Sequence, residues 1–208
     1  MRDYGLKDLY PFKKVLSSTQ FLDYEKDPQE FYMRWVLGVK QIETAPMIVG
    51  RIFSELFADR KFDFRAELLK INAKYYISVF ERAIKLFPEL PAKDCELELK
   101  PRFKGFRIRA TLDGKVKTII ENKTGKTEWT QERADTSDQI TFQCLCWYLE
   151  YKKLPPPVML NWVDCRTKNP VKPVLTFYTE RNKEQLDYMA ERVARVIENI
   201  KIENWGTV

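Results

Sequence analysis

The sequence predicts an α/β fold in which helices flank a mixed central β-sheet. Two observations predict it. Helical segments come first along the chain, followed by three strands, a helix, two strands and a helix. Apolar residues recur every three or four positions in the helical segments and every second position in the strands. With 208 residues, 44% of them apolar and 32% charged, the chain suits one domain with one core. We expect a single domain over residues 1–208, helical at 1–90 and α/β at 91–208.

Three helices are predicted in the N-terminal part, over residues 17–37, 46–58 and 64–87. A hydroxyl side chain at 17, 18 or 19 can cap the first of them. Pro28 is expected to kink or split that helix, because proline breaks the helical hydrogen-bond ladder. Pro46 suits the first turn of the second helix.

Three strands are predicted next, over residues 95–99, 106–112 and 116–123. In the middle strand, apolar and polar residues alternate, which places them on opposite faces. The apolar face is formed by Phe106, Ile108, Ala110 and Leu112, and the polar face by Arg107, Arg109, Thr111 and Asp113. We expect the Asp113-Gly114 pair to turn the chain into the third strand.

The remaining chain predicts a loop at 124–135 and a helix at 136–152, opened by a capping-box pattern from Thr136 to Gln139. Two strands follow at 158–165 and 171–178. A final amphipathic helix is predicted over residues 181–200.

Composition limits the function. A formal net charge of +6 suits a polyanionic partner, and the absence of histidine leaves catalysis to carboxylates, Lys, Cys, Tyr or a metal. The four cysteines lack zinc-ribbon spacing and are expected to be core thiols. No apolar run approaches the ~20 residues of a membrane span, and no signal region begins the chain. We therefore expect no membrane partner and a cytoplasmic location, in the host cytoplasm if the protein is phage-encoded.

The most informative residues are Asp113 and the run Glu121-Asn122-Lys123. Glu121 and Lys123 share a strand face, and the expected turn brings Asp113 to the edge of the same site. Two carboxylates can bind a hard divalent cation such as Mg²⁺. A lysine beside the metal can orient or deprotonate a water, or stabilise charge on a phosphate. The pattern indicates a metal-dependent phosphodiesterase site in outline, with an exposed Glu121–Lys123 ion pair as the alternative.

Four segments of the chain follow one another in a familiar order. They are residues 16–21 with 27–32, residues 50–56, Asp113 with residues 121–125, and residues 143–147. They resemble the N-terminal helical signature, the metal-ligand helix, the catalytic core and the Gln-x-x-x-Trp motif of the PD-(D/E)XK nuclease superfamily. Within it, they are most similar to the RecB-like and lambda-type exonuclease branch. The resemblance covers residues 16 to about 150 and implies a restriction-endonuclease-like core.

The resemblance assigns roles to individual residues. It implies that Asp113 and Glu121 are metal ligands for Mg²⁺ or Mn²⁺, and that the backbone carbonyl of Asn122 completes the coordination. Lys123 would position or activate the attacking water. Gln143 would contact the backbone of the scissile strand or order the site.

Further nucleic-acid contacts are expected around this core. Trp147 follows Gln143 on the same helix, and Thr124 and Lys126 follow the catalytic strand. Arg107 and Arg109 share a face with Asp113, so they either contact phosphate or neutralise the acidic cluster.

Two positions depart from the family pattern. Ser54 stands where the family has a metal-ligating His or Glu, and the neighbouring Glu55 lies about 100° around the helix. Either Glu55 turns in as a ligand, or water replaces it, or activity is weaker. Asp27 stands where relatives with an iron–sulfur cluster have Cys, so no iron–sulfur cluster is expected.

The favoured interpretation is a metal-dependent DNA exonuclease that hydrolyses phosphodiester bonds in recombination or repair, with DNA and a recombination or repair protein as partners. One alternative is a nucleic-acid-binding protein on the same fold that has lost cleavage through Ser54. Another is a restriction-type endonuclease. The sequence leaves open the polarity of cleavage, the strand preference, DNA versus RNA, and whether the protein forms a ring, a dimer or no oligomer.

Overall fold

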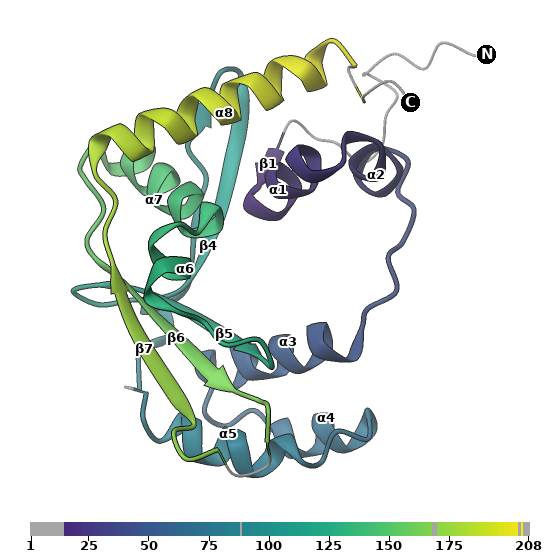
Figure 1. The fold of residues 1–208 in the computed structure, drawn as a ribbon, viewed down its shortest axis with the longest axis vertical. Helices are drawn as coiled ribbons and strands as arrows, with labels where there is room; N and C mark the ends of the chain where they lie inside the picture. Colours follow the sequence, from purple (N-terminus) through teal and green to yellow (C-terminus); the bar gives the residue numbers. More distant parts are fainter. Residues whose placement is uncertain (1–14, 88, 168–169, 204, 206–208) are drawn as a thin grey trace.

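A mixed sheet of seven strands forms the centre of the molecule in the computed structural model, which describes residues 15–87, 89–167, 170–203 and 205 (Figure 1). The strands are β1 (Val15–Ser17), β2 (Cys95–Leu99), β3 (Arg102–Phe103), β4 (Phe106–Lys115), β5 (Ile119–Gly125), β6 (Val158–Asp164) and β7 (Val174–Thr179). The main path runs β1-β4-β5-β6-β7, and β2 and β3 also pair with β4. The predicted fold class is confirmed.

Strand β4 is the long central element of this sheet. One of its edges pairs with β3 and then with β2, both antiparallel. Its other edge pairs with parallel β1 as far as Arg109, and with antiparallel β5 only at Gly114 and Lys115. Beyond that point β5 pairs with β6 in parallel over residues 119–125, and β6 pairs with β7. Among the described residues, the second edge of β4 therefore has no strand partner over residues 110–113.

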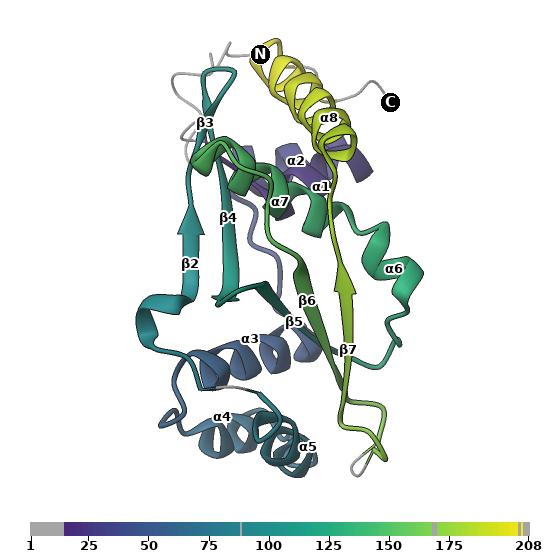
Figure 2. The same ribbon diagram turned by 90° about the vertical axis from the view of Figure 1, so that its left-hand side faces the viewer.

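Helices cover the sheet on both faces (Figures 1 and 2). They are α1 (Ser18–Lys26), α2 (Pro28–Phe31), the π-helix η1 (Tyr32–Val36), α3 (Ala45–Ala58), α4 (Phe64–Lys70), α5 (Tyr76–Ile84), the 3-10 helix η2 (Ala92–Asp94), α6 (Gln131–Asp135), α7 (Asp138–Tyr151) and α8 (Lys183–Lys201). The apolar core under α1, α7 and α8 includes Ile119, and the core under α3, α4 and α5 includes Ile120. Neighbouring residues of β5 thus face opposite cores, as the pleat requires.

The predicted break in the first helix is confirmed. Ser17 caps α1 in a reciprocal capping box with Gln20, whose side chain accepts the Ser17 N–H at 2.8 Å. Pro28 then opens α2, and the Asp27 carboxylate accepts the N–H groups of the next two residues. Proline begins a helix easily because its missing N–H has no partner there.

The prediction of one helix over residues 64–87 was wrong, because the chain breaks between α4 and α5. Asn72 adopts a left-handed backbone with φ of +55°, and the Ala73 N–H bonds back to Leu68 O at 2.8 Å. Asparagine tolerates this conformation better than most residues, so it ends the first helix. The apolar spacing continued across the break and gave no sign of it.

Three smaller differences concern short segments. Strands β1 and β3 have three and two residues, too few to show an alternating pattern. Helix α6 lies inside the predicted loop at 124–135. All four cysteines are buried and free, which confirms the expected core thiols. None of the helices in the described ranges is long and apolar enough to cross a membrane.

The start of α7 is held by Arg181, which was predicted to begin the last helix but precedes it. The Arg181 side chain is 4% exposed. Its guanidinium donates to Thr141 Oγ1 at 2.7 Å, Thr179 Oγ1 at 2.6 Å and the Ala134 carbonyl at 2.9 Å. One side chain therefore joins the end of α6, the first turn of α7 and the end of β7.

Replacing Arg181 with Ala is expected to lower the free energy of unfolding by about 2–4 kcal/mol, because several buried acceptors lose their donor at once. Urea unfolding followed by circular dichroism measures the change. The matched control is Arg65→Ala, since Arg65 forms an exposed ion pair with Glu81 and should lose less than about 1 kcal/mol. Equal losses in the two variants would contradict a structural role for Arg181.

Candidate active site

The candidate site forms where β4 and β5 separate. The chain turns at residues 116–118, where the Val116 N–H bonds to Thr118 O at 3.0 Å. The prediction that Asp113 and Gly114 form this turn was wrong, because both belong to β4. Gly114 serves packing instead, since a Cβ there would lie only 2.7 Å from the Leu90 side chain.

Asp113 lies where the two strands separate, and its side chain takes the place of a backbone hydrogen-bond acceptor. Its Oδ2 accepts the backbone N–H of Asn122 at 2.6 Å. A buried backbone N–H needs a partner, and here a side chain supplies it where the strand ladder has stopped. The contact fixes the carboxylate of Asp113 against the backbone that carries Glu121 and Lys123.

Glu121 is 3% exposed and is surrounded by donors. Its Oε1 accepts from Lys123 Nζ at 2.6 Å and from Gln139 Nε2 at 3.0 Å. Its Oε2 accepts from Gln143 Nε2 at 2.8 Å. Lys123 Nζ also donates to Gln139 Oε1 at 2.8 Å, so Glu121, Lys123 and Gln139 close a triangle. The ion pair considered as an alternative is present, with the Lys123 side chain 24% exposed, but Glu121 is buried and Gln139 bridges the two residues.

Gln139 is the site residue that the sequence interpretation missed. It was assigned to a capping box with Thr136, but the helix is capped by Ser137, whose hydroxyl accepts the Ile140 N–H. The helix therefore starts at Asp138, and the Gln139 side chain is free to face β5. Gln139 and Gln143 are four residues apart and share a helix face, a spacing that could have revealed the pair.

Gln143 also fills the open edge of β4. Its Nε2 lies 3.3 Å from the carbonyl of Thr111, a residue that β2 pairs on the opposite edge of β4 only. Its Oε1 is buried and has no hydrogen-bond partner among the described residues. Gln143 thus orders Glu121 and presents one spare acceptor beside it.

Two arginines fix the beginning of α7, and so the position of Gln139. Arg181 joins its first turn to β7, as described above. Arg192 of α8 binds Asp138, the first residue of α7, through Nη1 at 2.6 Å. The same guanidinium pairs with Glu25 of α1. Helices on this face are therefore tied together beside the carboxylates.

A second polar chain fixes β5 from the opposite direction. Asn161 Nδ2 donates to Asn122 Oδ1 at 3.1 Å, and Thr176 donates to Asn161 Oδ1 at 2.9 Å. These residues lie on β5, β6 and β7 in turn, so the chain crosses three strands. It holds Asn122, whose N–H anchors Asp113, in a fixed orientation.

Asp113 and Glu121 are two neighbouring carboxylates in a site with little access to solvent. Burial, followed by repulsion from Glu121, raises the pKa of Asp113 to about 7, against the opposing effects of the Asn122 N–H and Lys123. A cation placed between the carboxylates would relieve that repulsion. The pair is therefore suited to a positively charged ligand.

The residues present fit Mg²⁺ or Mn²⁺ held in part by water. Mg²⁺ commonly takes one or two carboxylates and keeps several waters. Asp113, Glu121 and the carbonyl of Asn122 could hold such an ion, and the spare Gln143 oxygen could accept from a coordinated water. Within the described ranges, no three His, Cys, Asp or Glu side chains form a metal-binding group.

Helix α3 lies beside this part of β5 but adds no carboxylate to the pair. A Cβ on Gly50 would lie 3.4 Å from Thr124 Oγ1, so the helix approaches the strand there. One turn later, Ser54 donates to the Gly50 carbonyl at 3.3 Å. Glu55 lies 3.4 Å from Arg51 and is half exposed, so it does not join Asp113 and Glu121.

The other expected nucleic-acid contacts are dispersed. Trp147 is 7% exposed and packs in the core, with Lys115 Nζ 4.9 Å from its ring centroid. Lys126 is exposed beyond the end of β5. Arg109 lies 3.8 Å from Glu98, and Arg107 is exposed near the start of β4. Of these residues, the structure brings none into hydrogen-bond contact with the carboxylate pair.

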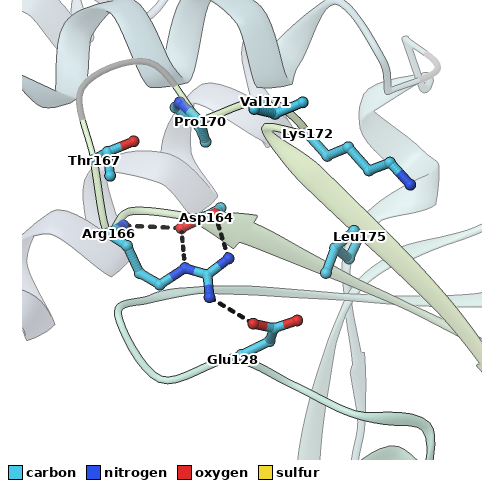
Figure 3. A pocket seen from close by; sticks show the side chains of 8 residues that line it. All are labelled: Glu128, Asp164, Arg166, Thr167, Pro170, Val171, Lys172 and Leu175. Carbon is cyan, nitrogen blue, oxygen red and sulfur yellow. Dashed lines mark hydrogen bonds and ion pairs between the residues drawn. The ribbon is translucent and has the colours of Figure 1, made fainter.

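A hollow of about 670 Å³ lies past the end of β5 (Figure 3). Arg166 crosses it and binds Asp164 at 2.8 Å and Glu128 at 2.5 Å. These partners raise the pKa of Arg166, whose charge is thereby paired. Because Glu128 belongs to the loop after β5, the ion pairs anchor that loop. The carboxylates of Asp113 and Glu121 do not line this hollow.

Comparison with known proteins supports the fold. No family model and no curated protein matches the sequence. A candidate exonuclease from Eubacterium rectale matches in structure with a TM-score of 0.65 and 11% identity, over 91% of this chain and 82% of that one. The alkaline exonuclease LHK-Exo from Laribacter hongkongensis matches with a TM-score of 0.54 and 16% identity, over 91% and 89%. Its complex with dAMP matches with a TM-score of 0.54 and 15% identity. The predicted resemblance to exonucleases is confirmed at the level of the fold.

The raised pKa of Asp113 predicts how stability depends on pH when no metal is bound. The folded protein keeps the Asp113 proton up to about pH 7, whereas the unfolded chain releases it near 3.8. The folded state therefore binds more protons between these values, and the contribution of Asp113 to the free energy of unfolding falls as pH rises through them.

Asp113→Asn should remove this fall, because the amide oxygen can still accept the Asn122 N–H. In EDTA we expect the free energy of unfolding of the variant to exceed that of wild type by about 1–3 kcal/mol at pH 8 and to match it near pH 4. Urea unfolding at both pH values gives the measurement, with the exposed Asp187→Asn on α8 as control. A variant less stable than wild type at pH 8 would show that the carboxylate is not strained.

Proposed function

We propose that this protein is a metal-dependent DNA nuclease, and specifically an exonuclease that acts in recombination or repair. The observation that carries the proposal is the group of Asp113, Glu121 and Lys123 at the separation of β4 and β5. This group combines two convergent carboxylates with a fixed ammonium, on a fold shared with solved exonucleases.

Asp113, Glu121 and the Asn122 carbonyl would hold Mg²⁺ or Mn²⁺. When bound, such an ion polarises a phosphoryl oxygen and lowers the pKa of a coordinated water. The protein contributes the fixed positions of the carboxylates, which the Asn122 N–H and three donors to Glu121 maintain. Little reorganisation is then needed when substrate arrives.

Lys123 is the residue proposed to contact the attacking water or the phosphate. An ammonium has three N–H donors, and Glu121 and Gln139 accept two of them. The third can orient the attacking water or stabilise charge on the phosphate. The water oxygen would form a bond to phosphorus, the bond to the 3′ oxygen would break, and that oxygen would take up a proton. The products are a 5′-phosphate and a 3′-hydroxyl.

The choice of DNA and of an exonuclease rests on the fold neighbours. One matched protein is described as an alkaline exonuclease, and one of its structures contains dAMP. The net charge of +6 agrees with a polyanionic substrate. The proposed partners are DNA and a recombination or repair protein.

One observation favours a second candidate, a nucleic-acid-binding protein without cleavage. Ser54 is engaged with its own helix, and Glu55 pairs with Arg51, so α3 supplies no ligand to the pair. With only two protein carboxylates, metal affinity could be too weak to support hydrolysis. Metal-dependent cleavage separates the two candidates.

The first test is digestion of end-labelled linear and closed circular DNA with Mg²⁺, Mn²⁺ or EDTA. We expect metal-dependent loss of linear DNA only, and a decrease of about 10²–10⁴-fold for Lys123→Ala. If wild type and Lys123→Ala both retard DNA in a gel but neither cuts it with either metal, the binding-protein candidate replaces the nuclease.

Gln139 is a positioning residue, because it acts through Glu121 and Lys123. Gln139→Leu keeps the size of the side chain and removes both hydrogen bonds. We expect kcat to fall by about 10–100-fold while KM for DNA stays within about twofold, since an interaction needed only in the transition state is lost.

The matched control is Gln131→Leu on exposed α6, which should leave kcat unchanged. Urea unfolding of both variants shows whether the fold is retained. An increase in KM at constant kcat would assign Gln139 to substrate binding instead of positioning.

A further inference from the structure

One short segment of the chain carries a strong local excess of positive charge. Residues 100–109 contain five Lys or Arg and no Asp or Glu, a formal charge of +5 against +6 for the whole chain. This segment includes β3 and the first part of β4. Figure 2 shows it at the end of β4 away from α3, α4 and α5.

The segment folds into a tight hairpin that presents its cations. Lys104 and Gly105 form the two-residue loop, with φ of +50° and +85°. Positive φ at both positions is the signature of the turn that best matches the twist of paired strands. A hollow of about 600 Å³ borders the hairpin, and Arg102, Lys104 and Arg107 line it.

The nearby carboxylate of Glu98 already forms ion pairs with other cations of this segment. Glu98 on β2 binds Lys100 at 2.5 Å and Arg109 at 3.8 Å. Within the part of the chain that the structure describes, Arg102, Lys104 and Arg107 form no ion pair. The hollow is therefore lined by three exposed, uncompensated cations.

The hairpin also places two of these cations against each other. Arg102 and Arg107 are direct cross-strand partners. Like charges directly opposite on paired strands destabilise the pair, so the free hairpin is unfavourable in this respect. An anion bound between them would remove the penalty.

We propose that this hollow binds phosphates of the same nucleic-acid molecule whose end lies at Asp113 and Glu121. The inference rests on the proposed function and adds a second contact to it. Arg107 and Asp113 are six residues apart on β4, a distance of about 20 Å at the strand rise of 3.3–3.4 Å. This corresponds to about six nucleotides of one DNA strand. Nucleic acid fits better than an acidic protein or lipid surface, because one strand then carries both contacts.

The test removes the three charges together, as Arg102→Gln, Lys104→Gln and Arg107→Gln. Affinity for a duplex of about 24 base pairs is measured in EDTA over a range of NaCl concentrations. We expect a loss of about tenfold or more at 0.1 M salt, and a slope of log K against log [salt] that is smaller by about 2–3.

The matched control removes three exposed lysines that flank α4 and α5 in the chain, Lys61→Gln, Lys74→Gln and Lys85→Gln, and Figure 2 shows these helices at the end of the molecule away from β3. It should leave the salt slope close to wild type. Equal effects of the two triple variants would overturn the inference, since net charge alone would explain them. Binding to vesicles of phosphatidylglycerol that depends on the hairpin, without an effect on DNA, would overturn it in favour of a membrane surface.

A stability measurement gives an independent outcome. Arg107→Gln should raise the urea midpoint of the DNA-free protein while weakening DNA binding, because it relieves the repulsion with Arg102. A lowered midpoint would make Arg107 a structural residue and overturn the inference.

If wild type binds DNA through the hairpin but never cuts it, the proposed nuclease fails and the hairpin contact stands. If wild type cuts DNA and the triple hairpin variant binds DNA as tightly as wild type, the proposed nuclease stands and the hairpin contact fails.

Discussion

The bond from the Asn122 N–H to the Asp113 carboxylate is the contact on which the site depends. It occurs where β4 and β5 have stopped pairing as strands, so a side chain must satisfy a backbone group that the ladder has left. The same contact sets the carboxylate beside Glu121, where burial and repulsion raise its pKa. A ladder that continued past Gly114 would pair the Asn122 N–H with a backbone carbonyl and leave the Asp113 carboxylate without this donor. The separation of the two strands is thus what joins Asp113 to the segment that carries Glu121 and Lys123.

Packing against α7 fixes the second half of the site. Gln139 and Gln143 reach Glu121 from successive turns of one helix face, and their reach depends on where that helix begins. Arg181 and Arg192 set this position by binding its first turn from β7 and α8. Their contacts lie outside the carboxylate pair, yet they determine whether Lys123 keeps two of its donors engaged. The C-terminal part of the chain therefore contributes to the site without touching it.

The sequence predicted the repeating patterns and the break at Pro28, but it missed interruptions that no proline marks. Alternation in β4 was visible because Phe106 and Ile108 mark a buried face, and the structure keeps that alternation up to Leu112. The interruption at Asn72 depends on one left-handed residue, which the apolar spacing does not report. Asp113 and Glu121 were predicted as site residues from residue types and strand pattern, and the structure places both where β4 and β5 separate. The turn beside them was misplaced, because Gly114 looks the same whether it serves a turn or close packing. Gln139 was assigned to a cap by a local rule, and only tertiary packing shows its other partners.

Charge along β4 gives the molecule a direction. The hairpin cations lie at the start of this strand, and Asp113, beside Glu121 of β5, lies near its other end, with Glu98 pairing the intervening cation, Arg109. A polyanion is attracted to the hairpin cations, whereas the Asp113 and Glu121 carboxylates repel a phosphate placed directly beside them unless a metal ion occupies the pair. A nucleic acid could therefore bind by its backbone before the metal arrives, but could bring a phosphate to Asp113 and Glu121 only afterwards. Under the proposed function, cation binding would be a condition for productive alignment as well as a source of chemistry, so binding and cleavage are to be measured separately.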